Sequence, residues 1–241
     1  MWKGDRMLSR LAPLALVGVL LVSGSACSGD GGGGGGGADD ATPEEVMATA
    51  KTKLDETSGV NIALETTDLP DGVTGILTAD GVGTHAPAFE GSIVVAIAGG
   101  TPTVKVIAVD DVVYAVLPFT TEFQEINPGE YGAPDPAQLM SADAGLSSLL
   151  PATTSLEKGE SIRGGDNNKE IFTEYTGTVP GSTVKNIIPG STGDFEATYT
   201  ISDSGELRTA VLTGEFYQGA DTMTYTIEFD DYGTEKDITA P

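Results

Sequence analysis

Hydrophobic and polar residues alternate along most of the chain after residue 60, in short runs that end at glycine, aspartate or asparagine. Neighbouring side chains of a β-strand point to opposite faces, so this period of two predicts strands. Gly99-Gly100, Asp110-Asp111 and Asp203-Ser204-Gly205 predict tight turns between antiparallel neighbours. The predicted strands cover 60–67, 73–79, 82–89, 91–98, 103–109, 112–117, 122–126, 156–162, 169–177, 194–202, 206–217 and 222–230.

The pattern changes to a helical period in four short segments. Thr42, Pro43 and Glu45 predict a helix that begins with a capping box and ends at Ser58-Gly59. The other three segments each begin with a predicted N-cap, and a proline is predicted to end the last two. They run from Asp135 to Met140, from Asp143 to Pro151, and from Ser182 to Pro189. Each is apolar on one side, so we expect these helices to pack on a sheet.

The predicted sheet is too large to stay flat. Ten to twelve strands within about 180 residues must close into a barrel, fold into a sandwich or curl. The strand at 92–98 is apolar on both faces, so water cannot cover either face completely. We expect helices on one face and a ligand on the other.

Cys27, the only cysteine, follows a segment with the pattern of a bacterial lipoprotein signal. Basic residues precede an apolar stretch over 11–22, and small residues occupy 23–26. An uncleaved membrane anchor is the alternative, although a span needs about 20 apolar residues. The predicted organisation is a signal peptide over 1–26, a lipidated Cys27 with a glycine-rich tether over 27–41, and a folded domain over 42–241. We expect the domain at the extracytoplasmic face of the cell membrane, held there by the lipid.

Charge and residue usage exclude several functional classes. Residues 27–241 contain 9 basic and 35 acidic residues, a formal charge of −26, which would repel nucleic acid. His85 is the only histidine, and the chain has no Gly-x-Ser-x-Gly motif, so neither a zinc site nor a hydrolase triad is expected. Asp110-Asp111 and Asp230-Asp231 lack calcium-loop spacing. The sequence therefore predicts a protein that is not an enzyme and has no cofactor.

Several segments, in order along the chain, resemble one known family. The segment from Asp135 to Leu150 follows a DPAQ…D-x-GL…L pattern. The other similar segments are 108–117, 123–128, 160–164, 184–189 and 197–207. From about Thr42 to its end, the chain resembles the mycobacterial LprG/LppX/LprA family of lipid-carrying lipoproteins.

The resemblance implies an α+β fold of the LolA/LprG type: a curved antiparallel half-barrel of about 10–12 strands with a few short helices, enclosing a large apolar pocket. It implies a carrier that holds the acyl chains of lipids or glycolipids, with a major-facilitator transporter as a candidate partner. The alternative is a non-catalytic envelope sensor or scaffold that binds a partner protein. The two functions differ in whether the concave face is hollow or filled.

Candidate pocket residues follow from the alternation of side chains, with ordinary core packing as the alternative for each. One face of each of two strands supplies Ile93, Val95 and Ile97, and Val104, Val106 and Ala108. The resemblance places Ile93 near the pocket mouth. The helical segments supply candidates for a lid: Leu139, Leu146, Leu149, Leu150, Ile187 and Ile188. Candidate rim residues are Phe119, Phe123 and Tyr131.

Overall fold

A single antiparallel sheet dominates the computed structural model, which describes residues 41–131, 133–165 and 168–241. Within these residues the sheet has eleven strands in the order β6-β5-β4-β3-β2-β1-β11-β10-β9-β8-β7. The predicted lipidation site, Cys27, and most of the predicted tether lie outside the described residues. The predicted antiparallel α+β class is confirmed.

The sheet consists of two meanders joined edge to edge. The first contains β1 (Gly59–Glu65), β2 (Gly75–Thr84), β3 (Ala88–Ala96), β4 (Thr103–Val109), β5 (Val112–Val116) and β6 (Gln124–Ile126). The second contains β7 (Thr154–Gly164), β8 (Glu170–Val179), β9 (Thr192–Ser202), β10 (Leu207–Glu215) and β11 (Met223–Asp230). They join where β1 pairs with β11, with Ile62 opposite Phe229.

One strand prediction was wrong. The runs predicted at 73–79, 82–89 and 91–98 form only β2 and β3, because Gly81 lies inside β2 and opposite Gly91 of β3. A Cβ at Gly81 would lie 2.5 Å from the Phe89 ring, so this glycine leaves room for the ring and does not mark a turn. The turn comes later, at residues 85–87.

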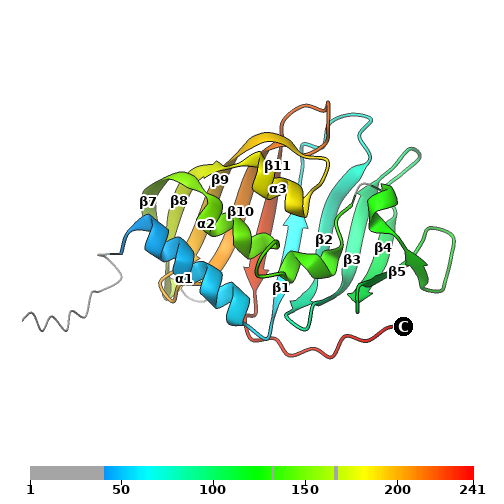
Figure 1. Ribbon diagram of the computed structural model, residues 1–241, viewed down its shortest axis with the longest axis horizontal. Coiled ribbons are helices and arrows are strands. Elements are labelled where there is room, and N and C mark those ends of the chain that lie inside the picture. Colours follow the sequence, from blue (N-terminus) through cyan, green and yellow to red (C-terminus); the bar gives the residue numbers. More distant parts are fainter. Residues whose placement is uncertain (1–40, 132, 166–167) are drawn as a thin grey trace, which may run out of the picture. The chain divides into compact units, whose positions relative to one another are not determined.

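The helices lie on one face of the sheet (Figure 1). They are α1 (Pro43–Glu56), α2 (Leu149–Ala152) and α3 (Gly181–Ile187), with the 3₁₀ helices η1 (Pro128–Tyr131), η2 (Pro136–Met140) and η3 (Leu146–Ser148). No helix in the described part of the chain is both long and apolar enough to cross a membrane.

Helix α1 has the predicted capping box. Thr42 Oγ1 accepts from the Glu45 amide at 3.3 Å, and Glu45 Oε2 accepts from the Thr42 amide at 2.9 Å. The helix buries Met47, Ala50 and Leu54 against the sheet.

The caps of the shorter helices are only partly as predicted. Asp135 does cap η2, because its Oδ1 accepts from the Ala137 amide at 2.9 Å. Asp143 caps no helix, and Pro151 lies within α2, where a first-turn proline loses no helical hydrogen bond. Helix α3 begins at Gly181, before Ser182, and the Gly181 amide donates to Asp194 Oδ1 at 3.0 Å.

The buried core is divided. A large cluster lies between α1, α2, α3 and the β7–β11 side, and contains Phe195, Phe216 and Tyr225 in edge-to-face contact. A smaller cluster, which includes Phe89 and Val113, lies on the β3–β5 side. A cavity lined by members of both clusters lies between them.

Candidate functional site

The cavity lies between the helix-covered face of the sheet and the helices themselves, and its volume is about 320 Å³. Almost every lining side chain is aliphatic or aromatic. The sheet contributes residues from β1, β2, β3, β4, β5, β6, β10 and β11, and the helices contribute residues from η1, η2, η3, α2 and α3. Such a space can hold hydrocarbon and offers no charged group to a ligand.

The exposure of the inner-face residues shows that the space is hollow. Ile93, Val95 and Val104 point to the helix-covered face, yet they are only partly buried. Further along the same face of β4, Val106 is 4% exposed and Ala108 is 0% exposed. The space over the helix-covered face is therefore filled by side chains near Val106 and Ala108 and left open near Ile93 and Val104.

Two tyrosines on the cavity wall form a closed ring of hydrogen bonds with one residue of β2. The Ile76 amide donates to the Tyr217 hydroxyl at 3.2 Å, and the Tyr225 hydroxyl donates to the Ile76 carbonyl at 2.6 Å. The two hydroxyls are 2.8 Å apart, so Tyr217 donates to Tyr225 and completes the ring. Burial raises the pKa of Tyr225 above its usual value, so its hydroxyl stays protonated and can donate within the hydrogen-bond ring.

This ring satisfies backbone groups that the sheet leaves free. Ile76 lies at a register shift between β2 and β3, where Ile76 pairs with Val95 and Thr78 pairs with Val94. All the polar groups of the ring have partners, so the ring adds no unsatisfied polar atom to the cavity wall.

Most of the residues predicted for the pocket lie on the wall of this cavity: Ile93, Val95, Ile97, Val104, Val106, Leu139, Leu146, Leu149, Ile187 and Ile188. Ala108 and Leu150 do not line it. Both are 0% exposed and pack inside the core, Ala108 against the β3–β5 cluster and Leu150 against the large cluster. Whether any of these side chains contacts a lipid stays a prediction.

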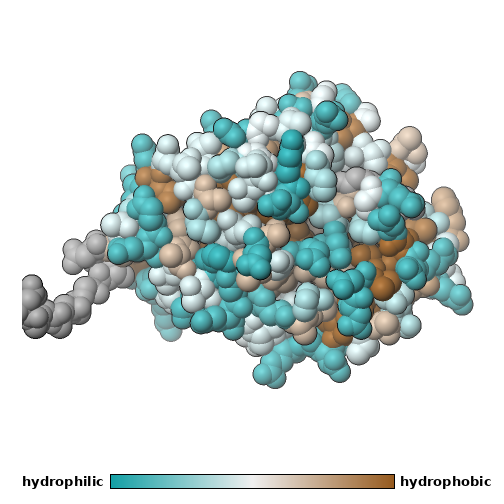
Figure 2. Space-filling model, viewed as in Figure 1, coloured by the Kyte–Doolittle hydropathy of each residue, from teal (hydrophilic) through white to brown (hydrophobic). Residues whose placement is uncertain are grey.

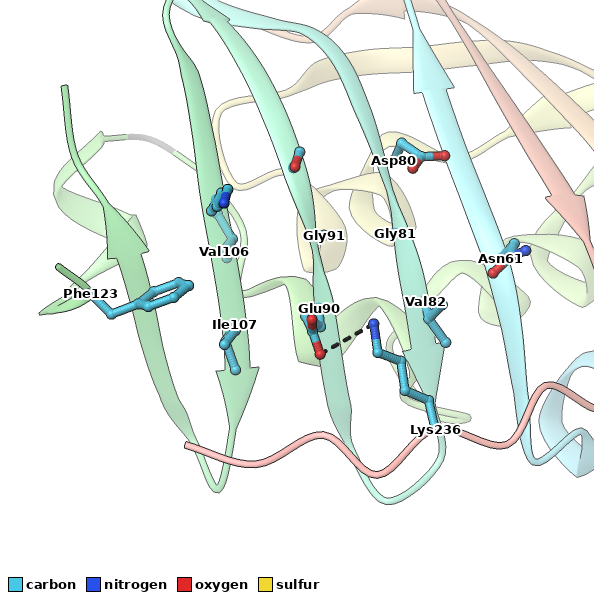
Figure 3. Close-up of a pocket in the computed structure, with 12 residues that line it drawn as sticks. Asn61, Asp80, Gly81, Val82, Glu90, Gly91, Val106, Ile107, Phe123 and Lys236 are labelled. Atoms are coloured by element: carbon cyan, nitrogen blue, oxygen red, sulfur yellow. Dashed lines mark ion pairs between the residues drawn. The ribbon is translucent and has the colours of Figure 1, made fainter. Parts of the chain in front are cut away.

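The predicted rim residues do not lie together. Phe119 is fully exposed beside Leu117 and Pro118, which line the cavity. Phe123 lies instead at a hollow on the opposite face of the sheet, as Figure 3 shows. The backbone of Tyr131 ends η1, and its side chain lies outside the described residues.

The hollow on the opposite face is polar and has a volume of about 400 Å³. It is lined by the alternate residues of the same strands, such as Glu90, Ser92 and Lys105. Lys236, from the segment after β11, pairs with Glu90 at 3.2 Å (Figure 3). The alternation therefore separates an apolar face from a polar one.

Several lining residues had not been predicted. Ile62 and Leu64 of β1, Leu212 of β10, and Tyr225 and Ile227 of β11 line the cavity where the two meanders join. The alternation in these strands showed that they have an apolar face. No sequence pattern within these strands indicated that this face would line the same cavity as β3 and β4.

The other residues considered for catalysis or metal binding have structural roles. His85 lies in the turn after β2, and its Nε2 is 2.7 Å from the Leu54 carbonyl near the end of α1. Asp110 and Asp111 both have positive φ in the two-residue turn between β4 and β5. Asp230 pairs with Arg208 at 2.9 Å. The described residues contain no cluster of histidine, cysteine and carboxylate groups that could hold a metal.

Comparisons with known proteins agree with this architecture. A comparison with curated protein sequences finds no match. Among solved structures, LprF from Mycobacterium bovis superposes with a TM-score of 0.66 at 14% identity, covering 83% of this chain and 96% of LprF. Lipoprotein LppX from Mycobacterium tuberculosis superposes with a TM-score of 0.60 at 19% identity, covering 82% of this chain and 98% of LppX. The family model of the LppX_LprAFG lipoproteins matches residues 42–240, so the chain belongs to this family.

Proposed function

We propose that this protein is a lipid carrier of the cell envelope that holds acyl chains in the apolar cavity. The observation that supports this most strongly is the cavity itself, a hollow between the two core clusters whose lining has no charged side chain. A sensor or scaffold would need no such hollow. Burying the methylene groups of one acyl chain there would gain about 0.8 kcal/mol each.

The size of the cavity limits what it holds. A volume of about 320 Å³ is at the lower end of the range of about 300–1,000 Å³ for ligand pockets. The cavity is therefore smaller than the large pocket that the family resemblance implies. We propose that one acyl chain enters first, and that further chains require the helices covering the cavity to move outward.

The proposed location follows from family membership. Lipoproteins of this family match the chain from residue 42 onward, and Cys27 precedes that match. We propose that Cys27 carries the lipid and that residues 28–41 tether the domain to the extracytoplasmic face of the membrane. A membrane transporter remains a candidate partner that supplies or removes the lipid.

Ile93→Trp tests whether the cavity holds an acyl chain. The larger side chain should fill part of the hollow, so binding of isotope-labelled palmitate, measured by native mass spectrometry, should fall several-fold. The free energy of unfolding should change little, whereas overpacking a filled core would cost about 1–3 kcal/mol. Val94→Trp is the matched control, because it adds the same bulk to the opposite face of β3.

Two results would contradict the proposal. If the parent protein binds neither palmitate nor a diacyl phosphatidylcholine, the cavity is no lipid site and the sensor function is favoured. If Ile93→Trp and Val94→Trp reduce binding equally, the bound chain lies elsewhere.

A further inference from the structure

Two neighbouring loops at one end of the sheet contain no charged residue. One is the hairpin of residues 96–102 between β3 and β4, and the other is residues 117–121 after β5. We call these two loops the uncharged tip. Charged residues make up 20% of the chain, and acidic residues outnumber basic ones by 36 to 12. Hydrophobic side chains also gather over the side of the molecule where β4 and β5 lie (Figure 2).

Phe119 is held at the outermost point of the second loop. The Thr120 amide and hydroxyl both donate to the Leu117 carbonyl, at 3.0 and 2.8 Å, and close a tight turn. Pro118 occupies the second position, and Phe119 occupies the third with a φ of 71°. Glycine is favoured at such a position in a type II turn, and a bulky residue is strained there. The turn therefore exposes a large aromatic ring at a cost in backbone energy, with no packing to offset it.

The tip is continuous with the cavity wall. Leu117, Pro118, Ile97 and Pro102 all line the cavity. The first loop is fixed by hydrogen bonds in both directions between Ile97 and Gly100, at 3.0 and 3.2 Å. Ile97 is 43% exposed although it lines the cavity, so it is accessible from outside as well. An apolar path runs from Phe119 across the tip into the cavity.

We propose that the uncharged tip inserts into the surface of a lipid bilayer, with Phe119 and Ile97 entering the acyl-chain region. An acyl chain could then pass from the bilayer into the cavity without crossing water. This inference rests on the proposed carrier function and specifies its docking surface.

Charge and size favour a bilayer over a protein partner. The formal charge of −26 on residues 27–241 repels anionic surfaces, so an uncharged part of the molecule approaches a membrane most closely. A stable protein interface takes about 20–30 residues from each partner, whereas the two loops contain 7 and 5 residues. Shallow insertion of a few apolar side chains to a depth of about 5–10 Å is enough to dock at a bilayer.

A single tryptophan reporter tests the insertion. Trp2 lies in the predicted signal peptide, and residues 3–241 contain no tryptophan, so Phe119→Trp adds one indole to the folded domain. The full chain is reconstituted on phosphatidylcholine vesicles that carry bromine on their acyl chains, and the parent chain supplies the background signal. We expect at least two-fold quenching and a blue shift of the Phe119→Trp indole. Ile162→Trp is the control, because Ile162 is 60% exposed on the edge strand β7, away from the cavity.

Equal quenching of the two variants, or no quenching of Phe119→Trp, would overturn the proposal. If Phe119→Trp does not fold, Ile97→Trp reports on the other loop. Quenching that appears only when an integral membrane protein is present would assign the tip to a protein partner instead. Palmitate binding by Phe119→Ser separates the two proposals. Slower loading of Phe119→Ser with unchanged final occupancy supports insertion of the tip. If even the parent chain binds no palmitate, the carrier function of the cavity is rejected, and the quenching result still decides whether the tip inserts.

Discussion

Tyr217 and Tyr225 show how polar atoms are accommodated beside an apolar cavity. At the register shift in β2, Ile76 has an amide and a carbonyl that the two hydroxyls bind. A buried backbone group without a partner would cost free energy comparable to a lost hydrogen bond. The tyrosines therefore allow the strand to bend beside the cavity while the lining stays free of unpaired polar atoms.

Tyr225→Phe should lower the free energy of unfolding by about 1–3 kcal/mol, because it leaves the Ile76 carbonyl without its donor. Tyr175→Phe is the matched control. Tyr175 is also buried, but its hydroxyl forms no hydrogen bond with any described residue, so its loss should cost less than about 0.5 kcal/mol. Urea denaturation of both variants measures the difference. Equal losses would mean that the ring contributes nothing beyond the burial of its side chains.

At the scale of the elements, the segment after β11 crosses the first meander and packs against its outer face. Ile238 is buried with Ala88 and Val109, at the ends of β3 and β4. In Figure 3 this segment passes Glu90, which pairs with Lys236. The final residues thus run from β11 of the second meander to the β3–β5 side of the first.

Ile238→Ala should cost about 2 kcal/mol of stability, because it removes buried methyl groups and leaves a cavity. Lys236→Ala lies two residues away and removes an ion pair that is partly exposed to solvent, so its cost should stay below about 1 kcal/mol. Chemical denaturation of each variant gives both values. A larger loss for Lys236→Ala would show that the segment is held by charge.

Element boundaries could be predicted wherever one local signal decided them. The capping box at Thr42 and Glu45 placed α1 correctly, because both hydrogen bonds lie within the first turn. Gly81 misled the strand prediction because its role depends on the ring of Phe89, which a pattern of turn residues cannot reveal. The start of α3 was missed because the acceptor for its first amide, Asp194, lies in the following strand, beyond any helix-start motif.

The same limit applies to the cavity. Alternation along one strand is local, so it placed Ile93 and Val95 on one face together. It could not show that Tyr225 lines the same space, because β1 and β11 are separated by most of the domain and pair only in the folded chain. Nor could it separate a hollow from a filled core, since both require apolar side chains.

At the scale of the whole molecule, the charge and the uncharged tip act in opposite directions at a membrane. The acidic surface repels anionic headgroups over about a Debye length, which is about 8 Å at physiological ionic strength. The tip gains free energy from burying apolar side chains, and that gain hardly depends on salt. Only the first effect therefore responds to ionic strength.

Lipid transfer between phosphatidylcholine vesicles should be nearly the same at low and high salt, because these vesicles carry no net charge and docking is apolar. Transfer between anionic phosphatidylglycerol vesicles should be slow at low salt and become faster as salt screens the repulsion. Stopped-flow transfer of a fluorescent acyl lipid at several salt concentrations measures both rates. A many-fold loss of transfer at high salt would indicate attraction between opposite charges at the docking surface. In that case the few cationic side chains, such as Lys105 on the opposite face of the sheet, would be the groups to examine, and apolar docking would be rejected.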